Sequence, residues 1–171
     1  AIEEVRNEYY QDNDFANWAI DDCALLEPKH EELSKLFGKD YDFPLIKNTR
    51  ENIDFDTDRN RYLDCSNAIE ITNQEQFLKW LGLTDEIING EDFSFSIFTP
   101  SFRNADTTID FDGFDSKFDE VIYNAQNKFK NHIEDVLKRI EADIDYRFTD
   151  EAIIEDIEAN DYECLSKGKG Y

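Results

Sequence analysis

Two histidines, three cysteines and a large excess of carboxylates are the residues of this chain that could take part in chemistry. His30 lies near the start of a predicted helix and His132 lies inside a longer one, and neither has a nucleophile in a glycine-rich turn nearby. Nucleophilic catalysis requires such a pairing of nucleophile and base. Cys23, Cys65 and Cys164 are too far apart in sequence to match the spacing of a zinc site. We therefore expect a protein that is not an enzyme and that uses no cofactor.

Three aspartates at alternating positions are the candidates for a metal site. Asp54, Asp56 and Asp58 lie on one face of a predicted strand, where their oxygens could hold a divalent cation. The stretch that begins at Asp56 resembles a calcium-binding loop only at its start. Arg61 stands where the sharp turn requires glycine, and Asn67 stands where a bidentate glutamate is required. A divalent-cation-binding protein is therefore kept as an alternative.

Net charge is the most unusual property of the sequence. There are 41 acidic and 18 basic residues, which gives a formal net charge of -23. A charge of this size repels nucleic acids and anionic membranes and attracts basic partners. The acids are concentrated at the two ends of the chain. The first 32 residues contain ten acids and two bases, and positions 150–163 contain seven acids and no base. The seven are Asp150, Glu151, Glu155, Asp156, Glu158, Asp161 and Glu163.

A helix after Thr149, whose hydroxyl is a suitable N-cap, would arrange these acids along one side. Glu151, Glu155 and Glu158 then share a narrow face. Three isoleucines are expected on the opposite, inward face: Ile153, Ile154 and Ile157. The acids follow one another at about 3 Å along the helix axis, close to the phosphate spacing of about 3.4 Å along one DNA strand. These seven residues are the predicted partner-binding site.

The fold class predicted from the sequence is α+β. We expect one globular domain over residues 1–171, with a loose tail from about residue 166, because the length suits one domain and no linker or repeat is present. Short strands predict a small, mainly antiparallel sheet of four or five strands packed by helices. These strands are expected at 53–57, 62–71, 93–98 and 107–111, with a last one at 162–165.

A long helix is predicted at about residues 115–146, since apolar residues recur every three or four positions without a proline or glycine. Its apolar positions are Phe118, Ile122, Ala125, Phe129, Ile133, Val136, Ile140 and Ile144. A structural or assembly protein that pairs through this helix, as a homodimer for example, is a second alternative. Tyr123 and Leu137 are the residues that would begin an additional apolar seam.

Turn and capping signals place further boundaries. A helix is expected over 30–37, with Gly38 as its C-cap. Thr72 and Glu75 have the spacing of a capping box before a helix that ends at Gly82. Residues 39–50, which include Pro44, are expected to form a loop.

The charge and the absence of chemical motifs favour a binding function. No secretory leader or long apolar run is evident, and the cysteines are unclustered, so a cytoplasmic location with reduced thiols is expected. The leading hypothesis is a non-enzymatic inhibitor that blocks a basic site on a partner protein, such as a nucleic-acid-binding enzyme or a toxin. DNA mimics and other anti-defence proteins of phages and mobile elements act in this way, as do toxin-immunity proteins. Direct binding to nucleic acid or membrane is not expected.

Overall fold

A computed structural model describes residues 1–11, 17–20, 25–55, 63–99 and 107–168, with the side chains of 17, 18, 50 and 161–168 left out of the description. The chain forms two compact units. Unit 1 contains Ala1–Ala19 and Arg139–Tyr171, and unit 2 contains Ile20–Lys138. Because compact units can still fold together, the single domain expected over 1–171 stays a prediction.

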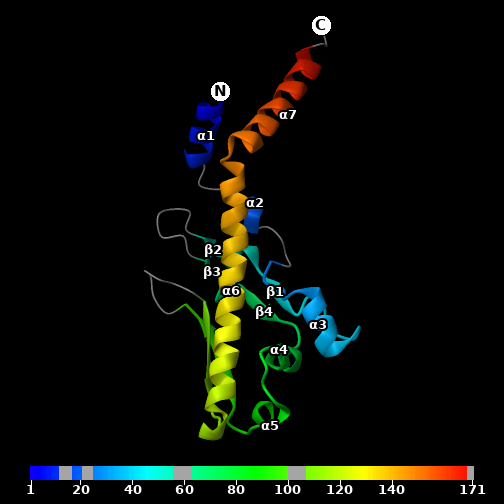
Figure 1. Ribbon diagram of the computed structural model, residues 1–171, viewed down its shortest axis with the longest axis vertical. Coiled ribbons are helices and arrows are strands. Elements are labelled where there is room, and N and C mark those ends of the chain that lie inside the picture. Colours follow the sequence, from blue (N-terminus) through cyan, green and yellow to red (C-terminus); the bar gives the residue numbers. More distant parts are fainter. Residues whose placement is uncertain (12–16, 21–24, 56–62, 100–106, 169–171) are drawn as a thin grey trace. The chain divides into compact units, whose positions relative to one another are not determined.

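The predicted long helix is confirmed as α6, Asp119–Arg147, which is continuous in Figure 1. A single 3-10 turn, Ser116–Phe118, precedes it, and the Asp115 carboxylate caps this turn by accepting a hydrogen bond from the Lys117 amide (3.0 Å). Seven of the eight predicted apolar positions of the helix are buried, from Ile122 to Ile144. The α6 residues 119–138 belong to unit 2 and residues 139–147 to unit 1, so the helix supplies apolar side chains to both cores.

Phe77 is at the centre of the unit 2 core. It lies on α4 (Gln74–Trp80), and its ring centroid is 5.8 Å from Phe95, 5.9 Å from Trp80 and 6.2 Å from Phe129. Phe77 and Phe129 have no exposed surface. These contacts join α4, the strand that carries Phe95 and helix α6 around one aromatic cluster.

The α+β class and the antiparallel pairing are confirmed, but the strands do not join into one sheet. The described residues form three two-stranded antiparallel sheets. Strand β5 (Ser94–Phe98) pairs with β6 (Thr108–Asp112), and β2 (Asp54–Phe55) pairs with β3 (Leu63–Asp64). In the third sheet, β1 (Ile46–Asn48) pairs with β4 (Ile69–Ile71). The expectation of a sheet with four or five strands was wrong on this point.

Two strand assignments also need correction. The segment 62–71 is not one strand, because a turn closed by the Ala68 amide and the Cys65 carbonyl (2.9 Å) separates β3 from β4. The predicted loop 39–50 contains β1, which pairs with β4 in a ladder extended by the Thr72 amide and the Leu45 carbonyl (3.0 Å). The first case is a local turn, whereas β1 forms by pairing with a distant segment, which periodicity in three residues does not reveal.

The helices expected at 30–37 and after Thr72 agree with the sequence except at one cap. Helix α3 spans His30–Phe37, and Gly38 ends it with a φ of 69°. Helix α4 is capped by Asn73 instead of Thr72: the Asn73 side chain accepts a hydrogen bond from the Gln76 amide (3.0 Å). The Thr72 hydroxyl is already used, because it donates to the Pro44 carbonyl (2.9 Å). The short helix α5, Asp85–Ile88, follows.

Unit 1 contains helices α1 and α7, part of the short helix α2 and the end of α6. Helix α1 covers Ile2–Gln11, and helix α7 covers Asp150–Gly168. The short helix α2, Asn17–Ile20, lies at the boundary between the units in sequence. Apolar burial in unit 1 involves α2, the end of α6 and the first turn of α7: Ala19, Ile140, Ile144, Ala152 and Ile153. The strand expected at 162–165 was wrong, because α7 continues as a helix to Gly168.

A half-buried carboxylate in unit 2 gives a pH-dependent prediction. One oxygen of Glu27 accepts a hydrogen bond from the Ile46 amide (2.7 Å), and the other is buried without a partner among the described residues. Desolvation raises the pKa of Glu27 above its ordinary value of 4.5, although the amides of Ile46 and Leu45 lower it in part. The folded state therefore binds this proton more tightly than the unfolded state, which favours folding at low pH.

We expect Glu27→Gln to become more stable than the wild type as the pH rises. Below pH 4.5 the wild-type side chain is protonated in both states, so the two proteins should be equally stable. As the pH rises from 4.5 through the raised pKa, the wild type loses the stability linked to this proton and the glutamine variant does not. Urea unfolding from pH 4 to 7 measures the difference. A constant difference over this range would contradict the assignment.

Among the described residues, no helix combines the length and the apolar character needed to cross a membrane. The cytoplasmic location expected from the sequence stays a prediction.

Candidate functional site

The two acidic ends of the chain come together in unit 1. This unit has fifteen acidic and five basic residues in its sequence, whereas the larger unit 2 has 26 acidic and 13 basic residues. Helices α1 and α7 contact each other within unit 1. The acids at positions 21–32 belong to unit 2 instead. Relative to its size, unit 1 is the more acidic part of the protein.

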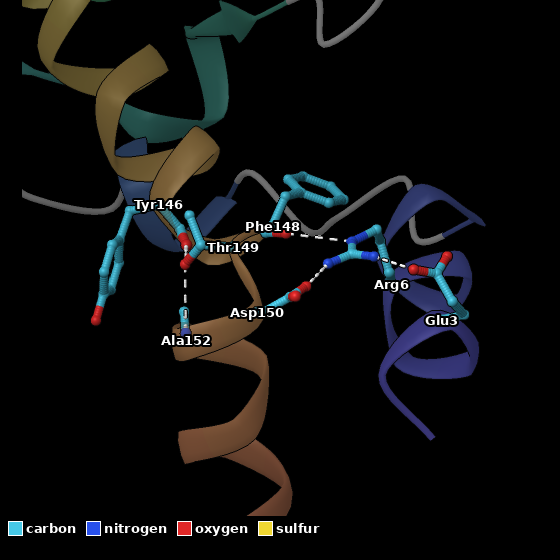
Figure 2. Close-up of polar contacts among 7 residues, drawn as sticks. All are labelled: Glu3, Arg6, Tyr146, Phe148, Thr149, Asp150 and Ala152. Atoms are coloured by element: carbon cyan, nitrogen blue, oxygen red, sulfur yellow. Dashed lines mark hydrogen bonds and ion pairs between the residues drawn. The ribbon is translucent and has the colours of Figure 1, made fainter.

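Arg6 on α1 joins the two ends (Figure 2). Its guanidinium donates to the carboxylates of Glu3 and Asp150 and, through Nε, to the Phe148 carbonyl at 3.2 Å. The hydrogen bond to Asp150 is the largest cause that raises the pKa of Arg6. One base thus pairs with acids from both ends of the chain, and a planar guanidinium suits these several acceptors better than an ammonium group.

Removing this guanidinium should release α1. No side chain of α1 is fully buried, so the bonds made by Arg6, together with the contacts of the Tyr9 and Tyr10 rings with Phe148, hold the helix. In Arg6→Gln we expect faster hydrogen exchange of the α1 amides, with little change in unit 2, because local opening costs less once these bonds are lost. Hydrogen exchange with mass spectrometry measures this. Lys35→Gln makes the same charge change on α3 and should leave α1 unaffected; equal exchange in both variants would contradict the role of Arg6.

Asp156 also has a structural partner. The Tyr9 hydroxyl donates a hydrogen bond to its carboxylate. Desolvation, followed by this bond to an anion, raises the pKa of Tyr9 to about 12, so the phenol stays protonated. Asp150 and Asp156, two of the seven predicted binding residues, therefore hold α1 against α7.

The start of α7 orients its exposed side. Thr149 was predicted to cap this helix, and its Oγ1 accepts a hydrogen bond from the Ala152 amide (3.3 Å) while donating to the Tyr146 carbonyl (2.6 Å). Ala152 and Ile153, in the first turn of α7, are buried. This places Glu151 on the exposed side.

Glu151, Glu155 and Glu158 are exposed, and we call them the acidic face. They lie within about 60° of one another around the helix axis. No lysine or arginine whose side chain is described pairs with any of them. Three charges over about 10 Å of axis are sparser than the phosphates of DNA. The acidic face therefore suits a basic protein surface, and close imitation of a DNA strand would need further acids.

An aromatic ring lies beside the acidic face. The negative charge of Glu155, then desolvation and the charge of Glu151, raises the pKa of Tyr146. Nearly half of the Tyr146 surface, 46%, remains exposed. Ile154 was expected to point inward, but it is 42% exposed because it lies only about 40° from Glu158 around the helix.

The other predicted site residues are only partly described. Asp161 and Glu163 lie in α7, but their side chains are outside the description. Of the candidate metal ligands, Asp54 is exposed in β2, whereas Asp56 and Asp58 are outside the described residues. Within the described residues, no group of three His, Cys, Asp or Glu side chains could hold a metal ion.

The assembly alternative has little to support it in α6. Tyr123 is exposed (63%), but Leu137 is half-buried. In the part of α6 that belongs to unit 2, Tyr123 is the one large hydrophobic residue with high exposure among those described. The assembly alternative stays a prediction.

Arg6 and Tyr146 were missed by sequence reasoning. Arg6 could have been noticed, because it is the one basic residue before Lys29 in an acidic segment. Tyr146 has no such signal, since its neighbourhood depends on the turn at 148–149. In comparisons with known proteins, no family model, curated protein or solved structure matches this chain.

Proposed function

We propose that the protein is a non-enzymatic inhibitor that binds a basic site on another protein through the acidic face of α7. The observation that carries this proposal is the exposure of Glu151, Glu155 and Glu158 together, without basic partners in the described part of the chain. Unpaired charges on one face attract an oppositely charged surface and speed its association.

The acids of unit 1 fall into two sets, one with partners inside the unit and one without a described basic partner, and this supports the proposal. Arg6 already compensates Asp150 and Glu3, and Tyr9 contacts Asp156, so these carboxylates maintain the unit. The acidic face makes no such contact with the described basic side chains. Self-repulsion among like charges costs stability, which a basic partner would relieve on binding. A DNA mimic, an anti-defence protein and a toxin-immunity protein are the kinds of inhibitor that would use this surface.

Capture from the native host tests the proposal. The wild type, Glu151→Gln/Glu155→Gln/Glu158→Gln and a control, Asp40→Asn/Glu91→Gln/Asp135→Asn, are immobilised at equal density. The control removes the same charge from exposed positions of unit 2. We expect a basic protein to be retained by the wild type and the control at low salt, to be lost at high salt, and to be retained poorly by the acidic-face variant. Equal retention by both variants would contradict the proposal.

A further inference from the structure

The exposed side of α7 also has an apolar component. Ile154 lies three residues after Glu151 and four before Glu158, so Glu151, Ile154, Glu155 and Glu158 have the i, i+3, i+4, i+7 spacing of a single helix face. The contacts between α1 and the first turns of α7 involve Asp150, which lies about 40° from Ile154 around the helix axis, and Asp156, which lies on the opposite side. Even so, 42% of the Ile154 surface remains exposed.

Tyr146 extends this face on its other side. The charge of Glu155 raises the pKa of the nearby Tyr146 hydroxyl, and Glu155 lies about 100° from Ile154 around the helix axis. The acidic face thus has an aliphatic side chain at one flank and a half-exposed aromatic ring at the other. An exposed apolar side chain alone needs no explanation. Here, however, two apolar side chains, Ile154 and Tyr146, lie on either side of unpaired acids. Together they form a mixed surface of the kind that binds amphipathic partners.

This inference rests on the function proposed above and specifies the partner: the geometry points to a basic amphipathic segment. An aliphatic side chain of that segment covers Ile154, while its arginines or lysines pair with the acidic face. Arginine suits the other flank best, because a guanidinium can stack on the Tyr146 ring and still pair with Glu155. A second copy of this chain does not fit, because its net charge of -23 would repel the face.

The two components respond differently to salt. Salt screens the attraction between charges, whereas the burial of an apolar side chain is not weakened in this way. The contact on Ile154 should therefore change the affinity by the same factor at every salt concentration. The charges of the acidic face should change the slope of affinity against salt.

A pair of designed helical peptides tests the inference. Both contain the same arginines and lysines on one side; one has leucines between them, and the other has glutamines at those positions. We expect the leucine peptide to bind the wild type about tenfold more tightly, which corresponds to about 1.4 kcal/mol. Ile154→Gln should abolish this preference with an unchanged salt slope, and Ile154→Val should keep it. Leu36→Gln, a control at an exposed position of α3, should also keep it.

The outcomes separate this inference from the proposed function. In one outcome, both peptides bind the wild type with equal affinity, and the acidic-face variant reduces the slope of affinity against salt. The amphipathic partner is then contradicted and the basic partner stands. If the preference for leucine persists in Ile154→Gln, the assignment to this face is wrong. If neither peptide binds, or the acidic-face variant leaves the slope unchanged, both the inference and the proposed function are contradicted.

Discussion

Phe77→Ala is expected to destabilise unit 2 by about 3–5 kcal/mol. The ring is fully buried and lies within 6.2 Å of three other aromatic rings, so its removal leaves a cavity that rigid neighbours cannot close. The loss is large compared with the 5–15 kcal/mol by which a typical domain is stable. We expect a clear fall in the denaturation midpoint, and partial unfolding if the wild type is only marginally stable.

Urea unfolding monitored by circular dichroism measures this effect. Leu36→Ala is the matched control, because Leu36 is also apolar but is 51% exposed, and it should change the stability by no more than about 0.5 kcal/mol. Similar losses for Phe77→Ala and Leu36→Ala would show that the aromatic cluster is not the centre of the unit 2 core.

Gly113→Ala is expected to be the second most damaging single change. Gly113 follows β6 and has a φ of 77°, a conformation that costs other residues about 1–2 kcal/mol. A Cβ at this position would lie 1.8 Å from the Asp92 carbonyl oxygen and 2.9 Å from the Phe93 nitrogen. The backbone at 92–93 must therefore move, which disturbs the stacking of Phe93 on Phe111 (5.9 Å). We expect a total loss of about 3 kcal/mol or more.

Gly82→Ala separates the two causes. Gly82 also has a positive φ, 97°, but a Cβ there meets nothing within 4 Å. This variant should lose only the conformational part, about 1–2 kcal/mol. If thermal unfolding shows the same loss for both glycine variants, the close approach of Gly113 to Asp92 does not contribute to stability.

The parts of the fold that could be predicted are those with a long local signal. The stripe from Ile122 to Ile144 repeats over many turns, so both the existence of α6 and its buried face followed from periodicity. Thr149 marks the start of α7 because its hydroxyl caps the helix, and Gly38 marks the end of α3 because glycine readily adopts a positive φ.

The errors have non-local causes. Nothing in Ile46–Asn48 alone indicates a strand, because its partner Ile69–Ile71 lies more than twenty residues away in sequence. The segment 162–165 is helical, although its composition suits a strand, because extending an existing helix adds a hydrogen bond for each residue fixed.

The candidate site was predictable in charge but not in detail. The sequence placed seven acids on or near α7, yet it did not show that Arg6 and Tyr9 engage Asp150 and Asp156. These contacts require α1 and α7 to lie together, and no pattern within either helix reveals that. The exposure of Ile154 could have been anticipated, because it is separated from Ile153 by about 100° and shares the side of Glu158.

Carboxyl footprinting of the complex with the captured partner tests the role of the acidic face most directly. A carbodiimide couples an amine to exposed carboxylates, and mass spectrometry locates the labelled residues. We expect Glu151, Glu155 and Glu158 to be labelled in the free protein and protected in the saturated complex, while Asp40, Glu91 and Asp135 are labelled equally in both. Full labelling of the three glutamates in the saturated complex would show that the partner binds elsewhere.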